Sequence, residues 1–203
     1  MNLETTITIF ATGTSEGVKK EWDERGRGRK ARPASTTTRT TKEKAAVDEF
    51  LKEIEKQGYD KSKTTIVYKA PVDSNFGVQP IAVSHNNTGI IEFHPDVWLE
   101  HAQNMPIGGV VAHELEHLKF KAFADDHNMN QENLMGLAKD DGVTGYSEEC
   151  WRQVYSHEAG IALGVHETLA EMARLQSDTG KLPGTAQWKD LYKRVNDYYA
   201  QHH

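Results

Sequence analysis

Residues 113–117 read His-Glu-Leu-Glu-His, and these residue types at this spacing could bind and use a metal ion. On an α-helix, residues four apart project from the same face, so His113 and His117 can reach one ion. Tetrahedral zinc takes imidazole nitrogens at about 2.0–2.1 Å. Glu114 lies one position around the helix, where a carboxylate can take a proton from water at the metal. The pattern predicts Zn²⁺ as the cofactor, His113 and His117 as ligands, and Glu114 as the catalytic base.

The flanking sequence favours a helix over residues 107–124. An apolar stripe at helical spacing lies on the side opposite the two histidines, which predicts an amphipathic helix with a buried back and a metal-binding front. The stripe consists of Val111, Leu115, Leu118 and Ala122. A chance match to three fixed positions has no reason to come with such a stripe.

A catalytic zinc site needs a third protein ligand and one open position. The downstream candidates are His127, His157, His166, Glu167 and Glu171. Glu167 and Glu171 are four apart and share one face of a predicted helix over residues 160–176. One of them can bind zinc while the other accepts a hydrogen bond from a ligand histidine and fixes its tautomer. A solvated acidic face is the alternative, and His166 is a rival ligand.

A His-Glu-x-x-His motif followed some 50 residues later by Glu-x-x-x-Glu resembles the gluzincin class of zinc metallopeptidases. The nearer likeness is to the catalytic domain of the anthrax lethal factor-like family. That resemblance implies Glu167 as the third zinc ligand, with Glu171 as its partner on the helix. It also implies that Tyr146, in Thr-Gly-Tyr-Ser, stabilises the oxyanion. The spacing from Tyr146 to Glu167 is longer here than in the family, which leaves Tyr155 as the alternative.

The order of the predicted elements is typical of an α+β fold, and the resemblance implies a zincin-like one with a small mixed sheet. A helix is expected from about Thr40 to Gly58, and strands are expected over residues 64–69, 80–84 and 89–93. The last two flank an Asn-Asn-Thr-Gly turn typical of a hairpin. Further helices are expected over 148–155, 160–176 and 187–199. In zincins a substrate adds as a strand to an edge strand above the metal, and Gly89–His94 is the candidate edge.

The charge is unevenly distributed and suggests two parts, a flexible basic segment over 1–42 and a metallopeptidase domain over 43–203. The first part has nine Lys or Arg and five Asp or Glu, so the net charge of −6 leaves −10 for the rest. The run Arg25–Arg32 could contact nucleic acid, but the composition favours a solvated linker, and the acidic domain disfavours nucleic acid as a partner. Residues 6–9 could form a strand, although nothing nearby in the sequence supplies a partner.

Cys150 is the single cysteine, which excludes a disulfide framework within one chain. No secretory signal is visible, and no apolar run approaches the roughly 20 residues of a membrane span. These features predict a cytoplasmic protein that does not bind membranes. The leading segment loosely resembles leaders on some phage-encoded proteins, so a virion-associated protein and an exported effector are two further settings.

Two functions remain open at this stage. The first is zinc-dependent peptide-bond hydrolysis, with a protein or peptide as substrate. The second is a catalytically silent protein of the metallopeptidase fold, either a binding or a virion-associated protein. Glu114 favours the enzyme, because a structural metal site does not need a base at that position. The sequence does not determine the oligomeric state.

Overall fold

The structure, a computed structural model, describes residues 6–8, 40–68, 79–127, 129 and 158–202. These residues form an α+β arrangement, which confirms the predicted class. The elements in chain order are β1 (Thr6–Thr8), α2 (Thr41–Lys56), a 3-10 turn η1 (Lys61–Lys63), β2 (Thr64–Ile66), β3 (Ala82–His85), β4 (Ile90–Phe93), α3 (Pro95–His101), α4 (Ile107–Asp126), α7 (Glu158–Thr179) and α8 (Ala186–His202). The predicted helix over 148–155 and the run Arg25–Arg32 lie outside the described residues.

Helix α2 begins where its capping sequence predicts. The Thr40 hydroxyl accepts from the Glu43 backbone N–H at 3.2 Å, and the Glu43 carboxylate accepts from the Thr40 N–H at 2.7 Å. This reciprocal pair satisfies two N–H groups that the first helical turn would otherwise leave without partners. One face of α2 is buried against the sheet, where the Phe50 ring stacks on Phe93 with centroids 4.0 Å apart. The cap and the apolar spacing therefore fix both the start and the orientation of α2.

The predicted hairpin is present as β3 and β4, joined by a turn over residues 86–89. Gly89 has a φ angle of 67°, a left-handed conformation that glycine adopts without strain. The Tyr59 hydroxyl donates to the Gly89 carbonyl and ties the turn to the segment after α2. The sheet is mixed, with the order β1-β3-β4-β2, in which β2 runs parallel to β4 and the other neighbours are antiparallel.

The prediction that Gly89–His94 forms the edge strand is wrong. Strand β4 is internal, because β3 pairs with one side of it and β2 with the other. The prediction rested on the zincin-like plan and on the position of this segment just ahead of the His-Glu-x-x-His helix. The return of Thr64–Ile66 to the far side of β4 is a long-range pairing that local sequence does not encode. Among the described strands, β1 and β2 form the two edges. Residues 6–8 thus have a partner after all, in β3.

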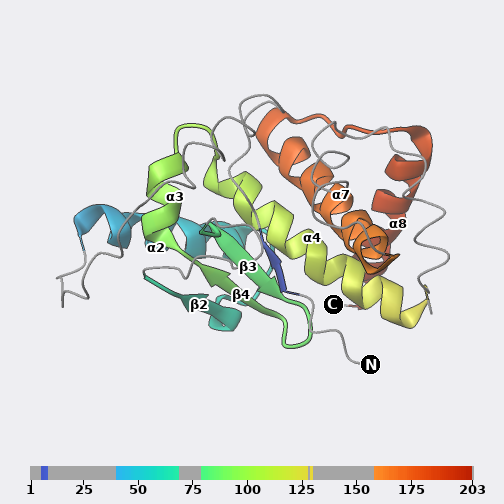
Figure 1. The fold of residues 1–203 in the computed structure, drawn as a ribbon, viewed down its shortest axis with the longest axis horizontal. Helices are drawn as coiled ribbons and strands as arrows, with labels where there is room; N and C mark the ends of the chain where they lie inside the picture. The colour runs from blue at the N-terminus through green and yellow to red at the C-terminus, as the bar shows by residue number, and fades with distance from the viewer. Residues whose placement is uncertain (1–5, 9–39, 69–78, 128, 130–157, 203) are drawn as a thin grey trace.

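Helix α4 runs through the middle of the molecule, with the sheet, α2 and α3 on one side and α7 and α8 on the other (Figure 1). Its first half belongs to one hydrophobic cluster with the sheet, α2 and α3, and its second half belongs to another with α7 and α8. The predicted stripe residues Val111, Leu115 and Leu118 are buried, but so are the histidines and both glutamates of residues 113–117. The helix is therefore buried on most sides and not simply amphipathic.

Helix α7 packs closely along α4, and Gly109 of α4 faces a side chain of α7. A Cβ atom at Gly109 would collide with the carboxylate of Asp178 near the end of α7. A larger residue there would require the Asp178 side chain to move away from Arg174, which binds it at 2.8 Å. The close contact matters because α7 carries Glu167 and Glu171. No helix within the described ranges has the length and apolar character needed to cross a membrane.

Candidate metal centre

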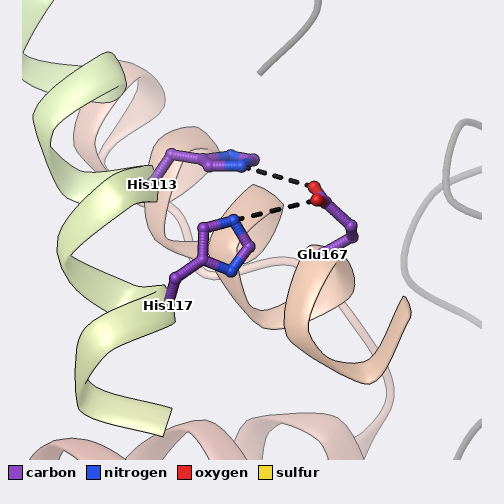
Figure 2. A group of neighbouring side chains, drawn as sticks. All are labelled: His113, His117 and Glu167. Carbon is purple, nitrogen blue, oxygen red and sulfur yellow. Dashed lines mark ion pairs between the residues drawn. The ribbon is translucent and has the colours of Figure 1, made fainter. Parts of the chain in front are cut away.

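His113, His117 and Glu167 come together between α4 and α7. Both imidazoles project from α4 toward the carboxylate of Glu167 on α7, and the dashed lines in Figure 2 mark the two contacts. The Nε2 atom of His113 lies 3.4 Å from Oε2 of Glu167, and Nε2 of His117 lies 3.9 Å from Oε1. One potential ligand atom from each residue falls within 4.8 Å of the other two. These three residues could hold a metal ion.

Two separations within the group are close to those around a small divalent ion. Bonds of about 2.0–2.1 Å at tetrahedral angles place two ligand atoms roughly 3.3–3.5 Å apart. The separation of His113 and Glu167 already lies in this range, and that of His117 and Glu167 is slightly longer. The Glu167 side chain is 23% exposed whereas the histidines are buried, so one side of the group faces solvent. Two imidazoles and a carboxylate also suit divalent transition metals other than zinc.

Several polar atoms at this site are buried without a well-formed hydrogen bond to any of the described residues, although His113 interacts with the carboxylates of Glu167 and Glu171. They are both ring nitrogens of His113, both ring nitrogens of His117 and both carboxylate oxygens of Glu114. An unsatisfied buried polar group costs about 1–3 kcal/mol, and more when it is charged. Native proteins leave few such groups, and a cluster of them on one side of a helix calls for a ligand. A bound cation would satisfy the imidazoles directly.

Glu171 approaches His113 from the side away from Glu167. One of its oxygens lies 3.8 Å from Nδ1 of His113. Arg174 holds Glu171 with two hydrogen bonds, from Nε at 2.8 Å and from Nη2 at 2.5 Å, and a third bond links Arg174 to Asp178 at 2.8 Å. Although burial raises the pKa of Glu171, Arg174 and His113 together bring it below its ordinary value. Glu171 is therefore a carboxylate held beside the Nδ1 atom of a candidate ligand, a position from which a glutamate can orient the ring.

The two histidines respond oppositely to their surroundings. Burial lowers the pKa of His113, but the carboxylates of Glu167 and Glu171 outweigh it and raise the pKa to about 9. Burial and then the positive charge on His113 bring the pKa of His117 well below its ordinary value. The two carboxylates thus stabilise one positive charge at His113, and a second positive charge at His117 is disfavoured.

Glu114 points to the sheet side of the cluster. Its side chain is fully buried, and burial raises its pKa to about 7, although His113 and then Ser84 on β3 act to lower it. A carboxyl group with a pKa near 7 is suited to exchange protons at neutral pH. Ser84 is itself buried, and its hydroxyl and backbone lie close enough to Glu114 to lower the pKa of that carboxyl group, although no well-formed hydrogen bond joins the two. Glu114 therefore has the burial and the weak hydrogen bonding expected of a base.

His166, the rival ligand, does not join the metal-binding group formed by the described residues. Its ring lies edge-on to Phe120 at 4.5 Å and 6.1 Å from the His117 ring, between centroids. Burial, with a smaller contribution from Lys121, lowers its pKa to about 4. His127 is remote, since it caps the end of α4 by bonding the Phe123 carbonyl at 2.9 Å.

Some predicted residues cannot be placed, and some that matter were not predicted. Tyr146, Tyr155 and His157 lie outside the described residues. Ser84 was not predicted, because no motif marks it and only the packing of β3 on α4 brings it to Glu114. Arg174 was not predicted either, although a basic residue three positions after Glu171 on one helix is a recognisable ion-pair spacing.

Comparisons with known proteins do not extend this description. The chain matches no protein-family model, no curated protein and no solved structure. The chemistry of the site must therefore be argued from its own residues.

Proposed function

We propose that this protein is a zinc-dependent peptidase of the gluzincin type with a zincin-like fold, in which His113, His117 and Glu167 hold the metal. The observation that carries the proposal is the carboxylate of Glu114, which is fully buried beside this group and makes no well-formed hydrogen bond to any described residue, with Ser84 as a nearby weak partner. A metal site that serves only structure does not need a poorly satisfied carboxylate next to it, and leaving one there lowers the stability of the fold. General-base catalysis gives that carboxylate a use.

Zinc at this site would supply a Lewis acid that polarises the scissile carbonyl and makes water more acidic. Glu114 accepts the proton of the attacking water at a carboxylate oxygen and later passes it to the nitrogen of the departing amine. Glu171, fixed by Arg174, keeps the His113 ring oriented so that Nε2 faces Glu167. Tyr146 stays the predicted donor to the oxyanion, with Tyr155 as the alternative.

Zinc content and peptide cleavage, measured on the same preparations of the full chain, test the proposal. We expect about one zinc per chain, hydrolysis within a broad peptide library, and a loss of about 10²–10⁴-fold in kcat for Glu114→Gln with zinc retained. Glu116→Gln is the matched control, because it makes the same change two residues away, and its kcat should stay within about threefold.

One zinc per chain with no cleavage by the wild type would favour the silent, metal-binding alternative. A chain that binds no zinc at all would contradict the site. Equal activity of wild type and Glu114→Gln would contradict the role of the base while leaving the metal site intact.

A further inference from the structure

Strand β1 lies at the edge of the sheet beside β3 (Figure 1), although it comes from the extreme N-terminal part of the chain. The pairing is antiparallel and places Thr6 opposite His85, Ile7 opposite Ser84 and Thr8 opposite Val83. Only three residues take part, which is at the short end for a strand. A strand this short makes few backbone hydrogen bonds, so another extended segment can compete with it.

The hairpin fixes which backbone groups of β3 face β1. The N–H of His94 donates to the carbonyl of Ile81 at 2.9 Å, so this antiparallel pair is a hydrogen-bonded one. Hydrogen-bonded pairs alternate along an antiparallel ladder. The backbone groups of Val83 and His85 are therefore turned toward β4, and those of Ser84 are turned toward β1. Ser84 is the residue through which β3 can bind another strand.

Ser84 is also the residue of β3 whose hydroxyl and backbone lie next to Glu114, and β3 packs against α4, which carries the candidate metal ligands. An extended peptide that reached Glu114 and the metal centre along the sheet would pair with β3 through the backbone of Ser84. Residue Ile7 already stands at that register position. The chain's own N-terminal strand and an incoming peptide would need the same place.

We propose that residues 6–8 occupy the peptide-binding edge of β3 and compete with substrate in the same molecule. This inference rests on the proposed peptidase function. It adds the place where the substrate backbone binds and the segment that competes with the substrate for that place. Because the competing strand is part of the chain, its effect is an equilibrium between a docked and an undocked state. If β1 is docked about nine-tenths of the time, the apparent affinity for a peptide is lowered about tenfold.

Proline substitution can test the competition in the full chain. Ile7→Pro removes the N–H that faces Ser84, whereas the N–H of Thr8 points away from β3, where proline is tolerated at an edge. Thr8→Pro is therefore the matched control. We expect Ile7→Pro to speed amide exchange at Ser84 and to raise kcat/KM on library peptides, each by about tenfold. Thr8→Pro should change both by less than about threefold, and the amides of Val83 and His85 should stay protected in both variants.

A synthetic peptide with the sequence of residues 2–12 provides a readout that does not need catalysis. Added to zinc-loaded Ile7→Pro, it should restore protection at Ser84 and inhibit hydrolysis, while the same peptide with proline at the position of Ile7 should do neither. Unchanged exchange at Ser84, or failure of the first peptide to restore it, would overturn the proposal. So would faster exchange with reduced activity, because β1 would then be a structural part of the sheet. If no variant hydrolyses any peptide, the peptidase function fails, and the exchange measurements still decide whether residues 6–8 occupy a peptide-binding edge.

Discussion

Helix α4 buries one glutamate on each of two opposite faces, and the two carboxylates have different surroundings. Glu114 lies on the front face with His113 and His117, and Glu116 lies on the back face toward α8. Two residues correspond to about 200° around a helix, which places the two carboxylates on opposite sides. Both are fully buried, and burial raises the pKa of each to about 7. Burial and a raised pKa therefore do not by themselves distinguish a candidate base from a structural residue.

Hydrogen bonding separates the two carboxylates. Asn196 on α8 donates to both oxygens of Glu116 at 3.2 Å, and Nζ of Lys119 lies 3.9 Å from one of them. Lys119 in turn donates to the Asn196 side chain at 2.8 Å, which closes a small network between α4 and α8. Neither oxygen of Glu114 makes a well-formed hydrogen bond to any described residue, and its contact with Ser84 is weaker. The comparison indicates that an unsatisfied polar group is the more informative mark of a functional site.

The largest expected effect is a loss of zinc binding on substitution of Glu167, which faces His113 and His117 from α7. Glu167→Ala removes one of three candidate ligands and should weaken zinc binding by about a thousandfold, measured by competition with a chromophoric chelator. His166→Ala is the matched control on the adjacent residue, and its affinity should change by less than about tenfold. A large loss of zinc affinity in His166→Ala with a small loss in Glu167→Ala would identify His166, and not Glu167, as the third ligand.

On the back face, Asn196→Ala should act on stability and leave zinc binding unchanged. The substitution leaves the buried carboxylate of Glu116 with only the distant Lys119 as a partner, so the free energy of unfolding should fall by about 2–3 kcal/mol. Chemical denaturation of the zinc-loaded protein measures this free energy of unfolding. A double variant with Glu116→Gln should recover part of the loss. A change in zinc affinity larger than about threefold would contradict the separation of the two faces.

The pH dependence of stability offers a smaller test of the back face. Because the pKa of Glu116 rises from 4.5 to about 7 on folding, the folded chain keeps a proton that the unfolded chain has released between those values. The stability contributed by Glu116 is therefore full below pH 4.5 and is lost as the pH rises toward 7. Glu116→Gln removes this loss. Relative to the wild type, the free energy of unfolding of the variant should rise by about 1–3 kcal/mol between pH 5 and pH 8.

Urea denaturation of the metal-free proteins at the two pH values measures this gain. Metal-free protein is used so that proton competition for the histidines is the same in both chains and cancels in the difference. A difference between the two chains that does not vary with pH would show that Glu116 keeps an ordinary pKa in the folded state.

The smallest expected effect concerns Arg174, which fixes Glu171 beside His113. Arg174→Met leaves the Glu171 carboxylate without its bidentate partner, so the orientation of His113 should loosen and zinc affinity should fall by about tenfold. Arg174→Lys keeps the charge but not the paired geometry, so its zinc affinity should lie between those of the wild type and Arg174→Met. Chelator competition again provides the measurement, and an unchanged affinity in the methionine variant would remove Arg174 from the support of the site.

Local signals in the sequence predicted much of this protein correctly. The capping pair Thr40 and Glu43 located the start of α2, and the Asn-Asn-Thr-Gly turn located the hairpin. The spacing of His113 and His117 placed both imidazoles on one face of a helix that runs from Ile107 to Asp126. Each of these features depends on residues within about one or two turns of one another. Backbone geometry alone fixes such relations.

Tertiary structure decided which of these local features meet. Only the packing of α7 on α4 brings Glu167 and Glu171 to opposite sides of His113, and only strand pairing makes β4 internal and β1 an edge. The difference between Glu114 and Glu116 also has this origin, since Asn196 reaches one of them from 80 residues away. Periodicity tells which side chains share a face, but contacts between distant segments depend on burial and register across the whole fold.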